Sequence, residues 1–338
     1  MSEKEIYEKV QERYGSAAKC KDDNHGDKIA KVFGYSEEEL KSIPRHANLG
    51  LSCGNPLALA KLKEVVLKIL YLLLCSRHYL TVTQGETVID LGSGAGFDVL
   101  LAAKKVGSSG KVIGVDFNKD MVKRANQNKE KVETNNVSFI ESFITDIPLP
   151  DTTVDCVISN CVINLVPESD KQNVFNEIYR LLRPGGRVAI SDILAKHELP
   201  EHVKSNMALY VGCIAGASRV EDYKKYLREA GFAGKDQKLQ HATPLSYNKC
   251  SDFGLYWPDI LLHDSGTDLN IYNTAKGDIK NCKCCGEGVE NACCEKTATC
   301  CSGLNPASGR SFNPISSDLE NVDFNELAGA FKIYAIKA

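Results

Sequence analysis

The chain has 338 residues, of which 43% are hydrophobic and 25% are charged, and its net charge is −3. This composition is that of an ordinary globular protein, and without a concentrated run of lysine or arginine it predicts no nucleic-acid partner. The charged start of the chain, MSEKEIYEKV, argues against a secretion signal. The longest apolar run begins at Val65, is interrupted by Lys68 and is too short to span a bilayer. We therefore expect a cytoplasmic protein without a membrane partner.

Cysteine is unusually frequent, with 14 residues in the chain. In a secreted protein this number would indicate a disulfide framework, but nothing here directs export. In a reducing compartment, clustered thiols more often bind soft metals or metalloids, or carry out redox chemistry. The composition therefore already indicates thiolate chemistry.

The N-terminal region is predicted to be helical with intervening loops. Apolar residues at helical spacing predict a helix over residues 2–14, and the polar stretch after it, which contains Cys20, is predicted to be a loop. Ser36 and Glu39 match a capping box and predict a short helix over residues 36–42.

From Glu86 onwards, strand-like and helix-like segments alternate. Five segments read as strands: TVIDL, KVIGVD, VSFIES, VDCVISN and RVAISDI. Helical segments lie between them, and a further helix, EDYKKYLREAGF, ends at Gly231. This alternation predicts a parallel sheet covered by helices. Two later segments, residues 237–245 and 330–338, are predicted to be further strands, antiparallel to one another.

The segment DLGSGAG, from Asp90 to Gly96, follows the first strand and opens a helix. Glycines at such a turn let the backbone N–H groups and the helix N-terminus approach a ligand closely. The loop begins with an acid and holds no basic residue for a phosphate, and a second acid, Asp116, ends the next strand, where it can bind a ribose diol. A tight turn in an unrelated α/β enzyme is the alternative.

These segments, together with LLRPGGRVAISD, resemble the motifs of class I S-adenosylmethionine methyltransferases. The resemblance implies a Rossmann-like, seven-stranded sheet with helices on both faces and S-adenosylmethionine as the cofactor. The expected cofactor-binding residues are Asp90, Gly92, Ser93, Gly94, Gly96, Asp116, Phe117, Ile144, Thr145 and Asn160.

Three cysteines are expected to meet at the mouth of this site. Cys161 follows the fourth strand, and ligands of open α/β sheets bind at the carboxyl ends of the strands. Cys213 follows the fifth strand, in a region that usually covers the active site, and Cys53 lies just before the core. Three thiols beside a methyl donor suit a soft, thiophilic atom. Any one of them could instead be a small buried residue.

The segments CGNP, DLGSGAGFDV, SNCVINL and YVGCIAGA, in this order, resemble arsenite methyltransferases. The resemblance implies that Cys53, Cys161 and Cys213 bind trivalent arsenic and that Cys20 takes part in disulfide exchange. It also implies thioredoxin or glutathione as the reductant and arsenic detoxification as the function. We keep two alternatives: a methyltransferase for another small molecule, and an inactive arsenic-binding buffer.

Two segments do not fit the plain pattern. In the family that this chain resembles, a short helix leads almost directly into the first strand, and residues 65–84 are additional here. This segment is either a retained intron or a lengthened apolar helix. The second segment is rich in vicinal cysteines, and it is predicted to be a redox-active disordered loop, an arsenite-capturing segment or a copper or zinc site. Its candidate metalloid ligands are Cys284, Cys285, Cys293, Cys294, Cys300 and Cys301.

The expected organisation has four regions. N-terminal helices and a thiol-bearing loop form residues 1–55, and the methyltransferase core covers residues 56–245. A cysteine-rich, partly disordered insertion follows over residues 246–326. Residues 327–338 return to the core as its final strand.

Overall fold

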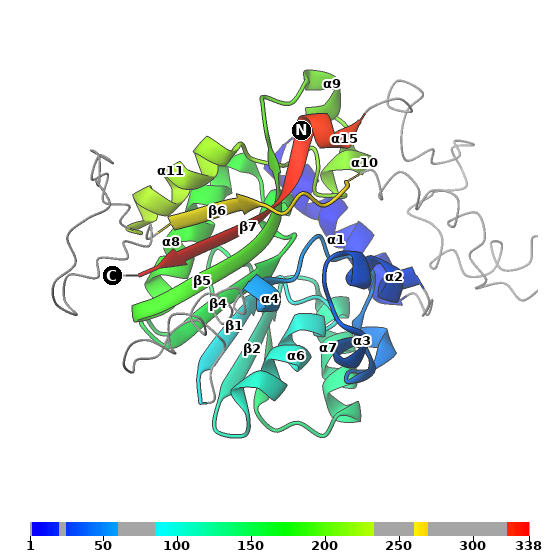
Figure 1. Cartoon of the computed structure of the whole chain (residues 1–338), viewed down its shortest axis with the longest axis vertical. Helices are drawn as coiled ribbons and strands as arrows, with labels where there is room; N and C mark the ends of the chain where they lie inside the picture. The colour runs from blue at the N-terminus through cyan, green and yellow to red at the C-terminus, as the bar shows by residue number, and fades with distance from the viewer. Residues whose placement is uncertain (1, 20–24, 60–84, 233–259, 270–322, 338) are drawn as a thin grey trace, which may run out of the picture.

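A seven-stranded sheet forms the centre of the protein. The computed structural model describes residues 2–19, 25–59, 85–232, 260–269 and 323–337. The strand order is β3-β2-β1-β4-β5-β7-β6 (Figure 1). The strands are β1 (Thr87–Leu91), β2 (Lys111–Asp116), β3 (Val137–Glu141), β4 (Val154–Asn160), β5 (Leu182–Ala195), β6 (Ile260–Asp264) and β7 (Ala328–Ile336). Among the described strands, β7 alone runs in the opposite direction to the others, and it pairs antiparallel with both β5 and β6.

Helices cover both faces of the sheet, as predicted for this class of fold. One core cluster packs α4 and α6 against side chains such as Val88, and the other packs α8 and α11 against side chains such as Ile89 (Figure 1). The described helices are α1 (Glu3–Lys19), α2 (His25–Val32), α3 (Glu37–Lys41), α4 (Pro56–Leu59), α6 (Phe97–Val106), α7 (Lys119–Lys131), α8 (Lys171–Leu181), α9 (Glu201–Lys204), α10 (Met207–Tyr210), α11 (Val220–Ala230) and α15 (Phe324–Leu327). Because neighbouring strand residues point to opposite faces, this two-sided burial explains the continuous apolar runs in the strands.

The N-terminal region contains more helix than the sequence predicted. Helix α1 continues through Gly15 to Lys19, and the first half of α2 lies in the polar stretch that was predicted to be a loop. A side chain at Gly15 would meet Asn118, so this glycine permits close packing of α1 rather than ending it. The predicted capping box is confirmed, because Ser36 Oγ accepts from the Glu39 N–H and the Glu39 carboxylate accepts from the Ser36 N–H.

The antiparallel edge of the sheet differs in one strand from the prediction. The final strand is confirmed as β7, but its described outer partner is β6, Ile260–Asp264, inside the region assigned to the insertion. Strand β6 is short and half-exposed, so its sequence carries little of the apolar pattern that marks the inner strands. The other segment predicted to be a strand, residues 237–245, lies outside the described residues.

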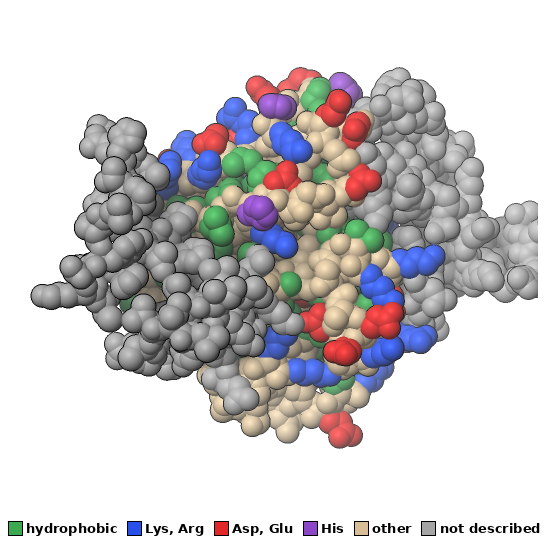
Figure 2. All heavy atoms as spheres, in the orientation of Figure 1, with side chains coloured by type: hydrophobic (Ala, Val, Ile, Leu, Met, Phe, Trp, Pro, Cys, Tyr) green, Lys and Arg blue, Asp and Glu red, His purple; other side chains and the backbone are tan. Residues whose placement is uncertain are grey.

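Several predicted features also lie outside the described residues. They are Cys20, the anomalous segment 65–84 and the cysteine-rich run from Cys282 to Cys301. Their roles stay predictions. Within the described residues, no helix combines the length and the apolar character needed to cross a membrane. On the face shown in Figure 2, acidic and basic side chains are interspersed.

Candidate functional site

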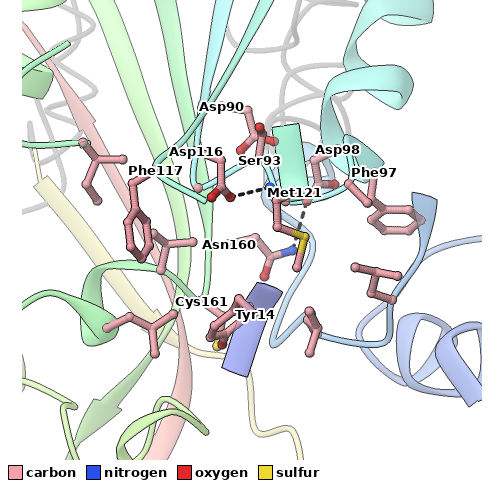
Figure 3. Close-up of a pocket in the computed structure, with 18 of the residues that line it drawn as sticks. Tyr14, Asp90, Ser93, Phe97, Asp98, Asp116, Phe117, Met121, Asn160 and Cys161 are labelled. Atoms are coloured by element: carbon pink, nitrogen blue, oxygen red, sulfur yellow. Dashed lines mark hydrogen bonds between the residues drawn. The ribbon is translucent and has the colours of Figure 1, made fainter. Parts of the chain in front are cut away.

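A pocket opens at the carboxyl ends of β1, β2 and β4, where the sheet was expected to bind its ligand (Figure 3). It encloses a cavity of about 120 Å³. Of the expected binding residues, its wall contains Asp90, Gly92, Ser93, Gly94, Asp116, Phe117, Ile144, Thr145 and Asn160, together with Cys161. Gly96 does not line the pocket; it has a φ of 89° and is the N-cap residue of helix α6.

A hydrogen bond connects the glycine loop to Asp116 at the end of β2. The Gly94 N–H donates to Asp116 at 2.9 Å (Figure 3). The Asn118 N–H donates to the other carboxylate oxygen at 2.8 Å. Gly92 has a φ of 66°, and a Cβ there would lie 2.4 Å from the Val162 side chain. The Ser93 hydroxyl is buried and has no hydrogen-bond partner in the described part of the chain. The loop therefore leaves both space and an unsatisfied polar group for a ligand.

Three buried carboxyl groups make this pocket favourable for a positively charged ligand. Asp90, Asp98 and Asp116 are each at most 8% exposed. Burial raises the pKa of Asp116 to about 6, and hydrogen bonds from the Asn118 and Gly94 N–H groups oppose that rise. Burial also raises the pKa of Asp98 and, with the charges of Asp98 and Asp116, the pKa of Asp90. A cation in the pocket would offset this cost of burying negative charge.

Sequence reasoning missed several residues of the pocket. Asp98 is the one acid in the apolar stretch FDVLLAA of α6, and a buried carboxyl group at such a place was a usable signal. Helix α1 contributes Tyr7 and Tyr14. Because α1 is far from the core in sequence, no spacing rule could place it there. Its Tyr7 ring meets the ring of Phe143 edge-on at 5.3 Å.

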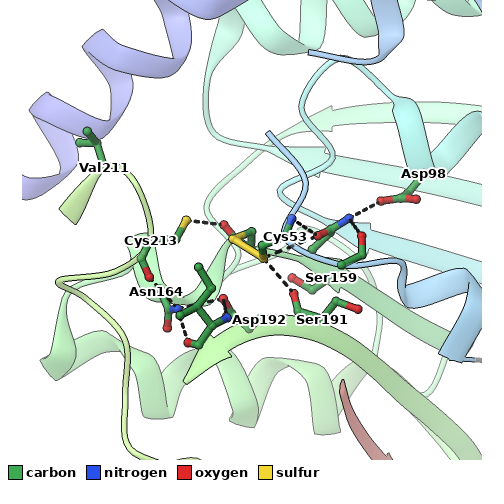
Figure 4. Close-up of a disulfide and its surroundings, with 12 residues drawn as sticks. Cys53, Asp98, Ser159, Asn164, Ser191, Asp192, Val211 and Cys213 are labelled. Carbon is green, nitrogen blue, oxygen red and sulfur yellow. Dashed lines mark hydrogen bonds between the residues drawn. A yellow bond between two sulfur atoms is a disulfide. The ribbon is translucent and has the colours of Figure 1, made fainter. Parts of the chain in front are cut away.

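The three predicted ligand cysteines lie together at the edge of this pocket (Figure 4). Cys53 and Cys161 are joined by a disulfide with a Cα–Cα distance of 5.6 Å. Cys213 is a free, buried thiol whose Sγ donates to the Cys161 carbonyl oxygen at 3.0 Å. Burial raises the pKa of the Cys213 thiol, so this group is protonated at neutral pH. In this state only one of the three sulfurs carries a proton or could ligate a metalloid.

The two asparagines of SNCVINL form hydrogen bonds with the backbone of Cys53 and Cys213, the two cysteines outside this segment. Asn160 Oδ1 accepts from the Cys53 N–H at 3.2 Å, and Asn164 Nδ2 donates to the Cys213 carbonyl oxygen at 3.1 Å. Asn160 Nδ2 also donates to Asp98 at 3.0 Å, so the cysteine loop is connected to helix α6 of the cofactor pocket (Figures 3 and 4). The short motif therefore positions all three cysteines.

The backbone at two of the cysteines is strained. Cys161 has a φ of 60° and Cys213 a φ of 64°, in the left-handed region that favours glycine. Of the non-glycine residues in the described ranges, only Glu133 and Thr152 share this geometry. Such strain, at a cost of about 1–3 kcal/mol per residue, persists where the surroundings impose it and is concentrated at functional sites.

A carboxylate lies beside the disulfide. One oxygen of Asp192 and the sulfurs of Cys53 and Cys161 all lie within 4.8 Å of one another. Burial raises the pKa of Asp192 to about 7, opposed by the Ile193 N–H and by Lys171. The Asn164 amide and the Tyr223 hydroxyl donate to this carboxylate. After reduction of the disulfide, this corner would offer soft sulfur donors in a buried setting.

Comparisons with known proteins agree with this geometry. Residues 82–231 match the family model of a methyltransferase domain. An arsenite methyltransferase of Halobacterium salinarum is 41% identical over 247 residues, which are 72% of this chain and 57% of that protein. An arsenite methyltransferase of Aquipseudomonas alcaligenes is 39% identical over 169 residues, 48% of each chain. The chain therefore spans about half the length of the curated relatives it matches.

A solved structure supports the fold. A putative sarcosine dimethylglycine methyltransferase from Galdieria sulphuraria superposes with a TM-score of 0.55, covering 91% of this chain and 92% of that one. The two sequences are 13% identical, so this likeness concerns the fold alone. The seven-stranded, Rossmann-like methyltransferase sheet predicted from the sequence is confirmed.

Proposed function

Because this chain carries a class I methyltransferase domain related to arsenite methyltransferases, we propose that it transfers methyl groups from S-adenosylmethionine to trivalent arsenic. The observation that supports this substrate most strongly is the meeting of Cys53, Cys161 and Cys213 beside the cofactor pocket. Arsenic(III) is soft and three-coordinate, and thiolates replace its hydroxyl groups. Neither an oxygen nor a carbon substrate would need three cysteines.

The pocket fits S-adenosylmethionine on its own observations. Gly92 and Gly94 leave room at the loop, Ser93 offers a free hydroxyl, and Asp116 can accept from a ribose diol. The buried acids suit a sulfonium cation, whereas the loop holds no basic residue for a phosphate. When bound, the cofactor supplies a methyl group on a positively charged sulfur.

The residues of this chain would act by holding and aligning the substrate. Thiolates of Cys53, Cys161 and Cys213 would hold arsenic with its lone pair free, so no proton has to be removed from the attacking atom. Alignment by Asn160 and Asn164 then carries most of the catalysis, and such alignment can supply on the order of 7–11 kcal/mol. Because Cys53 and Cys161 form a disulfide in this structure, they must be reduced first. Thioredoxin or glutathione in the cytosol is the proposed reductant.

The test is formation of S-adenosylhomocysteine by the full chain with and without arsenite, in the presence of a thiol reductant. The proposal expects turnover that depends on arsenite. Turnover that needs no arsenite would favour another small-molecule substrate. Tight arsenite binding without any S-adenosylhomocysteine would favour an arsenic-binding buffer.

We also predict a pH dependence of cofactor binding that arises at Asp116. Since its pKa is about 6, the carboxylate is available above that pH and becomes protonated below it. A proton and a ribose hydroxyl compete for the same oxygens, so the Kd of S-adenosylhomocysteine should be flat above pH 7 and rise about tenfold per pH unit well below 6. Titration calorimetry from pH 5 to 8 measures this. Asp116→Asn should bind weakly with no such slope, and an unchanged slope in that variant would assign the titration elsewhere.

The burial of Asp116 favours cofactor binding at high pH but stabilises the ligand-free protein at low pH. The pKa of Asp116 is higher in the folded chain than its ordinary value, so the folded state binds the proton more tightly. This stabilising contribution is full below the ordinary pKa of an aspartate and is lost as the pH rises through about 6. Denaturation experiments on the ligand-free chain should therefore show Asp116 favouring the folded state at low pH, where cofactor binding is weakest.

A further inference from the structure

The two cysteines of the disulfide line different cavities. Cys161 lines the cofactor pocket, whereas Cys53 lines a second cavity of about 150 Å³. This second cavity is lined by the end of α2 and the loop after it, by Ser191 of β5 and by strand β7, and it includes Ser265 and Thr267. The disulfide therefore lies between two cavities, and each cavity is lined by one of its two cysteines.

The second cavity is polar and carries a positive charge. Lys332 is its only charged lining residue among those described, and it pairs with Ser191 across β5 and β7. Ser191 is 1% exposed, and its hydroxyl has no hydrogen-bond partner within the described ranges. The hydroxyls of Ser265 and Thr267 lie 2.8 Å apart on the same wall. These groups suit a small anionic molecule that can also form hydrogen bonds.

We propose that this second cavity is the entry site for a small anionic thiol of the glutathione class, which reduces the disulfide by attacking Cys53. The proposal rests on the proposed function, because only reduced Cys161 can bind arsenic. An attacking thiolate approaches along the S–S axis, opposite the leaving sulfur. For an approach from the second cavity, Cys53 is the sulfur attacked and Cys161 is the leaving sulfur.

Two external thiol molecules are needed to reduce the disulfide completely. The first thiolate forms a mixed disulfide with Cys53, and the bond to Cys161 breaks, so that Cys161 leaves as a thiolate on the side of the cofactor pocket. A second thiolate then attacks the external sulfur of the mixed disulfide. The products are one oxidised thiol dimer and a reduced Cys53, and the two external thiols have supplied both electrons. Reduction by this route does not require the cofactor to leave.

The test follows reduction of the oxidised full chain by glutathione, without arsenic or methyl transfer. Samples are quenched with acid, alkylated and digested, and mass spectrometry locates the glutathione adduct. We expect the adduct on Cys53 and an early free thiol on Cys161. Saturating S-adenosylhomocysteine should change the rate less than about twofold. An adduct on Cys161, a tenfold slowing by S-adenosylhomocysteine, or a disulfide from Cys53 to another cysteine of the chain would each overturn the proposal.

A charge variant tests the cavity itself. Lys332→Gln should slow reduction by glutathione several-fold and should not slow reduction by cysteamine, which carries a positive charge. Lys111→Gln removes an exposed lysine at the start of β2, far from the disulfide, and should leave both rates unchanged. Equal slowing of both thiols in Lys332→Gln would overturn the cavity as the entry site. Because neither arsenite nor turnover is measured, this result is independent of the methyltransferase assay.

Discussion

Cys161→Ser is expected to lower arsenite-dependent methyl transfer at least about a hundredfold, since a lost thiolate also loses the alignment that catalysis depends on. Of the three proposed ligand cysteines, only Cys161 lines the cofactor pocket within the described structure. A serine hydroxyl is a hard, weakly acidic ligand that does not replace a thiolate on arsenic. The measurement is the initial rate of S-adenosylhomocysteine formation at saturating arsenite and cofactor.

The control for this variant lies on β4, the strand that Cys161 follows. Cys156 is buried in β4 and belongs to the hydrophobic core rather than to the site, and burial raises the pKa of its thiol to about 11. Cys156→Ala should cost about 1–2 kcal/mol of stability through the small cavity it leaves, with an unchanged rate. Cys161→Ser should bind S-adenosylhomocysteine within about twofold of the parent chain. If it retained more than about a tenth of the arsenite-dependent rate, Cys161 would not be a ligand that the reaction needs.

The parallel part of the fold was predictable because its physical signals are local. The inner strands are buried on both faces and are therefore rich in apolar residues, as in TVIDL and VDCVISN. The glycine loop was predictable because a tight turn with close ligand approach requires glycine at Gly92 and Gly94. Most of the pocket wall formed by the glycine loop and the ends of these strands was therefore predicted from the sequence.

The parts that were not predictable depend on contacts between distant segments. Nothing in the spacing of MSEKEIYEKV shows that Tyr7 and Tyr14 close the cofactor pocket. The disulfide pairs two cysteines that are 108 residues apart, and among many cysteines the sequence does not select that pair. The buried Asp192 was also missed, because its position beside the thiols depends on the register of β5 against β4.

Gly92→Ala is expected to weaken binding of the cofactor at least about tenfold, a loss of about 1.4 kcal/mol or more. Two effects combine at this position. The φ of 66° is strained for any residue with a Cβ, and the new methyl group would lie 2.4 Å from the Val162 side chain. Val162 follows Cys161 directly, so relief of this contact would move both the glycine loop and Cys161. Titration calorimetry with S-adenosylhomocysteine measures the first consequence.

Two further variants separate backbone strain from the steric clash. Gly185 has a φ of 79° with nothing within 4 Å of a built Cβ, so Gly185→Ala carries the strain alone. It should lower stability by about 1–2 kcal/mol and leave cofactor affinity unchanged. Adding Val162→Ala to Gly92→Ala removes the clash and should restore most of the lost affinity, although the strain remains. If the double variant bound the cofactor no better than Gly92→Ala, the close contact between this loop and Val162 would not be what requires glycine at position 92.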